Sequence, residues 1–242
     1  MSKEENLRKE YEIVEGFESY DIRFEDAKKR LKKFEEFYNN NKNFFGKKIL
    51  DLACGGGLFS NFLAEKRHIV TGVDILDPML KIAKENSPKN NPPKYIKANL
   101  LEFVPEEEFD TTIFLGNSIP HFSPKDFAKV LLNIREKTRY FIIAYRDSVS
   151  WGFEGRLKQI IIEEGKDYDV IDLYKGYDGE KDSIIKYRII YPKNDKVVLD
   201  YHLYNPGIVE GIMFAVGFRL VKREKYGPMK SLEEYIDIYE KV

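Results

Sequence analysis

The spacing of apolar residues changes along the chain, and each change predicts a different kind of element. Between residues 21 and 45, apolar side chains recur at helical spacing and charged positions lie between them. This pattern predicts an amphipathic helix that packs on the body of the domain and ends at residues 39–42.

Residues 47–145 alternate short apolar runs with amphipathic stretches. The apolar runs predict strands over residues 47–53, 68–74, 95–98, 109–115 and 140–144. The amphipathic stretches predict helices over residues 58–66, 77–84 and 124–136. Because strands alternate with helices, we expect right-handed βαβ units and an α/β fold with a doubly wound, mostly parallel sheet.

The pattern changes again after the last of these strands. Residues 147–180 are irregular and aromatic, with a helix expected at 156–164. Two alternating runs, 183–192 and 196–206, are joined by a short polar link and predict an antiparallel β-hairpin. After the hairpin we expect a helix over residues 206–216 and a strand over residues 218–226.

Composition narrows the functional classes. The chain has 40 Lys and Arg residues and 41 Asp and Glu residues, so it has no overall positive charge to bind a phosphate backbone. This balance argues against a nucleic-acid substrate. The single cysteine, Cys54, excludes an internal disulfide, and the 3 histidines lie too far apart to predict a metal site. The charged N-terminus lacks a signal-peptide core, and no apolar run reaches the roughly 20 residues of a membrane span, so we expect a cytoplasmic protein.

The stretch ILDLACGGGLFS, residues 49–60, predicts a strand that turns on glycine into a helix, the usual way to hold a nucleotide-like cofactor. Gly55 and Gly57 match the first two glycines of the dinucleotide motif G-x-G-x-x-G, but Ser60 replaces the third. Asp51, just before the turn, would repel a pyrophosphate and attract an ammonium or sulfonium group.

A second acid, Asp74, ends the next expected strand, where a carboxylate can accept hydrogen bonds from both ribose hydroxyls. S-adenosylmethionine has a ribose, an ammonium and a sulfonium but no phosphate. The two acids and the glycine turn therefore favour S-adenosylmethionine over a dinucleotide.

These motifs resemble those of the class I S-adenosylmethionine-dependent methyltransferases. DLACGGG, TGVDILDPML, the Ala98–Asn99–Leu100 turn and FDTTIFLGNSIPHF occur in family order over roughly residues 20–145. The resemblance implies a Rossmann-like, seven-stranded sheet whose last strand is antiparallel, with the cofactor across the carboxyl ends of the strands.

The resemblance also assigns cofactor contacts. It places Asp51, Ala53, Gly55 and Gly57 at the methionine end, Asp74 at the ribose, Ile75 and Met79 beside the adenine, Asn99 and Leu100 at the adenine edge, and Tyr20 over the cofactor. We therefore expect one methyltransferase domain over residues 1–242, with a cofactor-binding core (20–146), an inserted substrate lid with an antiparallel hairpin (147–205) and a final core helix and strand (206–242).

The segment after the fourth expected strand resembles that of the glycine and glycine/sarcosine N-methyltransferases. By this resemblance Asn117 would hold the acceptor amine and Arg146 its carboxylate, while Leu115 and His121 would lie against the cofactor. The acceptor would then be a small-molecule amine such as an amino acid. The hairpin carries the tyrosines of the expected lid, which is compatible with a homo-oligomer: Tyr187, Tyr191, Tyr201 and Tyr204.

Other interpretations stay open at this point. Arg146 would also suit an ion pair with a nearby acid, Asn117 a turn, and His121 a packing position. The alternative functions are a methyltransferase for protein or RNA, a nicotinamide-dependent oxidoreductase, and a binding protein that keeps the cofactor pocket without catalysis.

Overall fold

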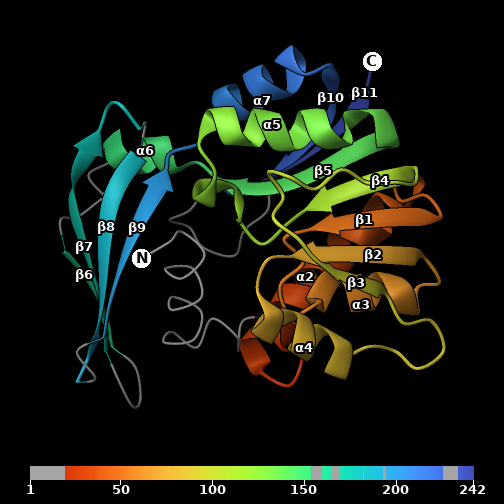
Figure 1. Cartoon of the computed structure of the whole chain (residues 1–242), viewed down its shortest axis with the longest axis horizontal. Helices are drawn as coiled ribbons and strands as arrows, with labels where there is room; N and C mark the ends of the chain where they lie inside the picture. Colours follow the sequence, from red (N-terminus) through yellow and green to blue (C-terminus); the bar gives the residue numbers. More distant parts are fainter. Residues whose placement is uncertain (1–19, 154–159, 165–168, 182, 193–194, 226–233) are drawn as a thin grey trace.

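The structure is a computed structural model, and it describes residues 20–153, 160–164, 169–181, 183–192, 195–225 and 234–242. The strands of this part of the chain form two sheets, one of seven strands and one of four (Figure 1).

The larger sheet has the order β10-β11-β5-β4-β1-β2-β3. Its strands are β1 (Lys48–Leu52), β2 (Ile69–Asp74), β3 (Lys94–Lys97), β4 (Phe109–Phe114), β5 (Thr138–Arg146), β10 (Phe218–Lys225) and β11 (Glu234–Lys241). Strands β1 to β5 pair in parallel, and β11 runs antiparallel to both of its neighbours, β5 and β10. The predicted doubly wound, seven-stranded sheet with an antiparallel last strand is confirmed. The expectation of a single strand after the last helix is wrong, because β11 follows β10 and is the antiparallel strand.

Helices cover both faces of this sheet (Figure 1). They are α2 (Glu25–Asn40), α3 (Leu58–Glu65), α4 (Asp77–Glu85), α5 (Pro124–Ile134) and α7 (Pro206–Ala215). Apolar residues of α2 and α3 form one buried cluster with β1, while those of α5 and α7 form a second cluster on the opposite face. Because β1 is covered on both faces, Ile49 to Leu52 are all buried, including the acid Asp51.

The smaller sheet lies within the expected insertion between β5 and α7. It is antiparallel, in the order β6 (Ile160–Glu164), β7 (Asp169–Asp178), β8 (Ser183–Tyr191) and β9 (Asp195–His202). The predicted hairpin is confirmed as β8 and β9. A short helix, α6 (Ser148–Phe153), precedes the sheet.

The prediction of a helix over residues 156–164 is wrong for residues 160–164, the part of this segment that the structure describes. Ile160–Glu164 is strand β6, paired antiparallel with β7, and residues 154–159 lie outside the described part. The run of three isoleucines has β-branched side chains that favour a strand once a pairing partner is available. The stretch expected to be irregular likewise contains β7.

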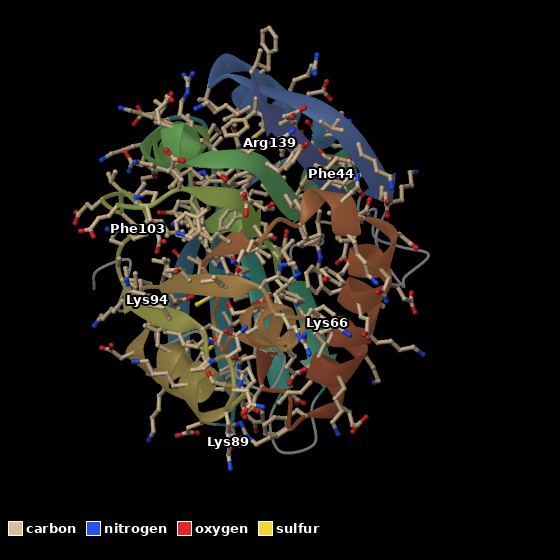
Figure 2. The ribbon with its side chains drawn as sticks, turned by 90° about the vertical axis from the view of Figure 1, so that its right-hand side faces the viewer. Phe44, Lys66, Lys89, Lys94, Phe103 and Arg139 are labelled. Atoms are coloured by element: carbon tan, nitrogen blue, oxygen red, sulfur yellow. The ribbon has the colours of Figure 1, made fainter. Side chains whose placement is uncertain are left out.

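The two sheets meet at one end of the molecule. In Figure 1 the carboxyl ends of the parallel strands point toward the smaller sheet. Tyr201 of β9 contacts Asn117, which follows β4, and Tyr204 donates a hydrogen bond to the carbonyl oxygen of Phe122 at 2.9 Å. The opposite, amino ends of the strands carry Lys94 and Arg139, as Figure 2 shows.

Candidate active site

The glycine turn that follows β1 has the backbone geometry that glycine permits. Ala53, Gly55 and Gly57 have positive φ angles of 50°, 53° and 73°. A Cβ atom built on Gly57 would collide with the Tyr95 hydroxyl oxygen, so no larger residue fits there without displacing its neighbours. Gly57 is also the residue directly before helix α3, at its N-cap position.

Asp51 is buried directly beneath this turn. Its side chain accepts a hydrogen bond of 2.6 Å from the Ser60 hydroxyl, and the residue is 1% exposed. Burial, together with the nearby charge of Asp74, raises the pKa of Asp51 to about 7. Ser60, which breaks the dinucleotide motif, is thus the hydrogen-bond partner of Asp51, a role that the motif comparison did not predict.

Asp74 joins the end of β2 to the glycine turn. One carboxylate oxygen accepts a hydrogen bond from the Gly55 amide at 2.8 Å, and the other accepts one from the Leu76 amide at 2.9 Å. Burial raises the pKa of Asp74. Because a carboxylate oxygen has more than one lone pair, these two bonds orient the group and leave it able to accept hydroxyl hydrogens.

The expected adenine region lies beside Asp74. Ile75 follows it in the chain, and the Met79 methyl carbon lies 3.1 Å from a Cβ built on Gly55. Asn99 closes a turn, since its side-chain oxygen accepts a hydrogen bond from the Leu101 amide at 3.0 Å, and Leu100 is buried.

Tyr20 spans the space between the glycine turn and the loop after β4. Its hydroxyl donates to the carbonyl oxygen of Gly116 at 2.9 Å, and its ring carbons lie 3.9 Å from a Cβ built on Gly55. The guanidinium carbon of Arg30 lies 4.7 Å from the ring centroid. Tyr20 therefore lies across the ends of β1 and β4.

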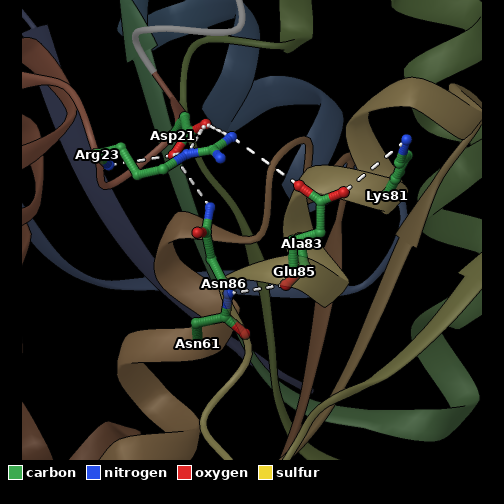
Figure 3. Close-up of polar contacts among 7 residues, drawn as sticks. All are labelled: Asp21, Arg23, Asn61, Lys81, Ala83, Glu85 and Asn86. Atoms are coloured by element: carbon green, nitrogen blue, oxygen red, sulfur yellow. Dashed lines mark hydrogen bonds and ion pairs between the residues drawn. The ribbon is translucent and has the colours of Figure 1, made fainter.

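The backbone around Tyr20 is fastened to the end of helix α4 (Figure 3). Asp21 is 1% exposed and accepts hydrogen bonds from the Asn86 side chain at 3.1 Å and from the Arg23 backbone amide at 3.1 Å. The Arg23 guanidinium pairs with the same carboxylate and lies 4.0 Å from Glu85. We call Asp21, Arg23 and Asn86 the clasp. The sequence did not predict it, because Asn86 lies 65 positions from Asp21 in the chain.

Asn117 and Arg146 are brought together by neighbouring strands. Asn117 has a φ of 60°, and its side-chain oxygen accepts a hydrogen bond from the Arg146 amide at 3.3 Å. Its side-chain nitrogen donates to the Tyr201 hydroxyl at 3.4 Å, which links the loop to the smaller sheet. The Arg146 guanidinium pairs with Glu234 of β11 at 2.6 Å, an acid that the sequence did not identify as its partner.

The remaining expected residues lie in the same loop. Leu115 is buried directly after β4, and His121 ends the short 3₁₀ helix η3 (Ile119–His121). Every residue that the sequence assigned to the site thus belongs to, or contacts, a segment at the carboxyl edge of the parallel strands. Within the described residues no group of His, Cys, Asp and Glu is arranged to hold a metal ion.

The charges of this edge suit a cation. Asp51 and Asp74 are both buried beside the turn, where a pyrophosphate would meet two carboxylates at close range. An ammonium or sulfonium group would instead be stabilised by them. No helix in the described part is both long and apolar enough to cross a membrane.

Comparisons with known proteins agree with this geometry. Residues 49–139 match the family model described as a methyltransferase domain. Human glycine N-methyltransferase is 31% identical over 180 residues, which cover 66% of this chain and 58% of that protein. The ubiquinone biosynthesis O-methyltransferase of Idiomarina loihiensis is 50% identical over 46 residues, only 19% of either chain. The chain thus spans less than two thirds of the length of these curated relatives.

Solved structures match over almost the whole chain. The PH0226 protein of Pyrococcus horikoshii superposes with a TM-score of 0.73 at 25% identity, covering 96% of this chain and 99% of that one. An S-adenosylmethionine-dependent methyltransferase from Clostridium acetobutylicum gives the same TM-score of 0.73 at 16% identity, covering 95% and 98%.

Proposed function

We propose that this chain, which carries a methyltransferase domain and has the class I S-adenosylmethionine-dependent methyltransferase fold, methylates a small-molecule amine such as an amino acid. The observation that carries the proposal is the convergence of two buried carboxylates, a left-handed glycine turn and the Asn117–Arg146 pair at one edge of the sheet.

The residues at this edge fit S-adenosylmethionine. Asp74 is held by two backbone amides in an orientation that would accept ribose hydroxyls, and Met79 would pack on the adenine side of the turn. Asp51 would face the cationic end of the cofactor, with Tyr20 closing the space above it. When bound, S-adenosylmethionine supplies an electrophilic methyl group on its sulfonium.

The chain's own part in the reaction is alignment and exclusion of water. Asn117 is anchored by the Arg146 amide and Tyr201, so its side-chain oxygen has a fixed direction from which it would accept a hydrogen bond from the acceptor amine. Arg146 would pair with the acceptor carboxylate through its guanidinium nitrogens, one of which is engaged by Glu234. An in-line displacement at carbon needs mainly this positioning.

The comparison with glycine N-methyltransferase supports an amine acceptor, because that match extends over 66% of this chain, whereas the match to the Idiomarina ubiquinone O-methyltransferase covers 19%. The near-neutral net charge of −1 argues against RNA. The smaller sheet, placed at the open end of the strands, would cover the acceptor as a lid.

The test is release of S-adenosylhomocysteine with glycine, sarcosine, other amino acids and simple amines as acceptors. We expect turnover with a carboxylate-bearing amine and a rise in its KM of about 100-fold in Arg146→Ala, the size expected for a charge-assisted pair. Arg139→Ala is the matched control, because Arg139 lies at the opposite end of the same strand, β5 (Figure 2). Equal KM values in wild type and Arg146→Ala would refute the amino-acid acceptor.

A further inference from the structure

The smaller sheet has an unusual distribution of polarity between its two faces. Antiparallel sheets with one solvated face normally alternate apolar residues inward and polar residues outward. Here the inward face carries charges that are buried or largely buried, namely Asp172, Lys186 and Arg188, among apolar neighbours. The open face is largely apolar at its centre, which contains Ile162, Ile171, Leu173, Ile185, Tyr187, Ile189 and Val198. Lys196, Asp200, Asp169 and Tyr191 lie around this centre on the same face.

This open face is accessible. Ile162 is 59% exposed and Val198 is 38% exposed, and the other apolar members are partly exposed. In Figure 1 the smaller sheet stands at one side of the molecule, away from the helices that cover the larger sheet. Contiguous apolar surface of this kind marks an interaction site more often than a free surface.

We propose that the open face of the smaller sheet is the interface between two copies of this chain. The proposal does not rest on the proposed function. It rests on the placement of residues about the centre of this face, where two isoleucines on β8 and two opposite charges on β9 lie at equal spacing on either side.

The line of near-symmetry passes through Tyr187 and Val198, which lie opposite each other on β8 and β9. Along β8, Ile185 and Ile189 lie on either side of Tyr187 at equal spacing. Along β9, Lys196 and Asp200 lie on either side of Val198, each roughly 7 Å away at strand spacing.

A two-fold axis along this line, between two stacked sheets, brings identical surfaces together with their strands antiparallel. Each Ile185 then faces Ile189 of the partner subunit, and each Lys196 faces Asp200 of the partner subunit. The apolar centre is therefore self-complementary, and the charges at its ends attract. A partner of one charge sign would not match both Lys196 and Asp200.

The size of the face also suits a dimer. Four strands at about 4.8 Å spacing and about nine residues in length give a flat area on the order of 500 Å². Stable interfaces bury about 800 Å² of accessible surface per partner, and accessible area exceeds flat area where side chains project. The two sheets would stack about 10 Å apart, as in a β-sandwich.

The test is the molar mass of the full chain in solution, measured by light scattering and sedimentation over a dilution series. We expect a dimer for the wild type. Val198→Glu should raise the dissociation constant of the dimer at least about tenfold, because each of the two copies would bury a new charge in the interface. Val221→Glu is the matched control, since Val221 is a strand valine of similar exposure, 41%, on β10.

An exchange of the two charges tests the two-fold axis itself. Its decisive result is the recovery of the dimer in a double variant, which loss of folding cannot produce. Lys196→Glu should weaken the dimer, and the double variant Lys196→Glu/Asp200→Lys should restore it, because each introduced glutamate would again face an opposite charge. Circular dichroism establishes that each variant is folded. A monomeric wild type, an unaffected Val198→Glu dimer, or a double variant no better than Lys196→Glu would each overturn the proposal.

Discussion

At the scale of single residues, the burial of Asp51 has a cost in stability, which accompanies the role in cofactor binding that we propose for it. It is 1% exposed, and its pKa of about 7 lies well above the ordinary carboxylate value of 3.8. Between these two pH values the folded state holds a proton that the unfolded state has lost, so the free energy of unfolding falls as pH rises. Above pH 7 the full cost of the buried charge is present.

Asp51→Asn should therefore stabilise the protein and weaken cofactor binding. We expect the free energy of unfolding at pH 8 to rise by roughly 2–4 kcal/mol, from the difference between the two pKa values. The affinity for S-adenosylmethionine should fall at least about tenfold, because the variant lacks the carboxylate that, by our proposal, would face the cation of the cofactor. Thermal unfolding and calorimetric titration measure the two effects.

The same residue predicts a pH dependence of binding. In the wild type the affinity for S-adenosylmethionine should increase from pH 6 to pH 8, because a cation is bound more tightly by ionised Asp51. In Asp51→Asn this increase should disappear. An unchanged pH profile in the variant would show that Asp51 does not contact the cofactor's cation.

Glu234 offers a second prediction at this scale. Its carboxylate pairs with Arg146 at 2.6 Å and would lie near the carboxylate of an amino-acid acceptor, which it would repel. Glu234→Gln keeps an acceptor for the Arg146 hydrogen bond but removes the charge. KM should fall by about threefold or more for acceptors that carry a carboxylate, and it should not change for simple amines.

At the scale of elements, the clasp fastens the backbone next to Tyr20 to the end of helix α4. Asp21 is buried and bonded to Asn86 at the end of α4, while Tyr20 is bonded to Gly116 after β4. Asp21→Asn or Asn86→Ala should free this segment and raise the dissociation rate of S-adenosylmethionine by about tenfold, because the cofactor would no longer be closed in.

Stopped-flow displacement by S-adenosylhomocysteine measures that rate. Glu85→Gln is a suitable control, since the ion pair of Glu85 with Arg23 is exposed and long, at 4.0 Å (Figure 3). If both variants release the cofactor at the wild-type rate, the clasp does not control the site.

The sequence predicted the parallel part of the larger sheet well. These strands are buried on both faces, so their continuous apolar runs and the amphipathic helices between them give clear signals, as in β1 and α3. The expected helix over residues 156–164 failed, because a run of isoleucines followed by glutamates gives no clear period. Only pairing with β7 decides its structure.

The sequence predicted those residues of the candidate site that belong to local motifs at the ends of strands. Asp51, Asp74 and the glycine turn are close in sequence to the strands that position them, so the strand ends bring them together. Ser60, Asn86 and Glu234 were not recognised as partners, because their contacts depend on tertiary structure: Asn86 and Glu234 lie 65 and 88 positions from Asp21 and Arg146.

At the scale of the whole molecule, the smaller sheet depends on a buried ion cluster. Asp172 accepts two hydrogen bonds of 2.7 Å from Arg188, and Lys186 lies 3.7 Å away. Burial alone would raise the pKa of Asp172, but the contacts with Arg188 and Lys186 hold it below its ordinary value. Its contribution to stability is therefore present above about pH 4 and is lost as pH falls below that.

Asp172→Ala should destabilise the smaller sheet by about 3 kcal/mol, because it removes a buried carboxylate shared by two cations. Hydrogen exchange should accelerate over residues 169–202, while the larger sheet keeps its protection, since the two sheets share no strand. Uniform acceleration across both sheets would contradict this expectation.

The apolar character of both faces of β8 has a consequence for how this sheet folds. Ile184 and Ile190 face inward, whereas Ile185 and Ile189 face outward. A slip of one residue would exchange the two sets at little hydrophobic cost. It would also move Arg188 away from its place opposite Asp172. Because both faces of β8 are apolar, the buried contacts of Asp172 with Arg188 and Lys186 are what distinguish the observed pairing from one shifted by a residue.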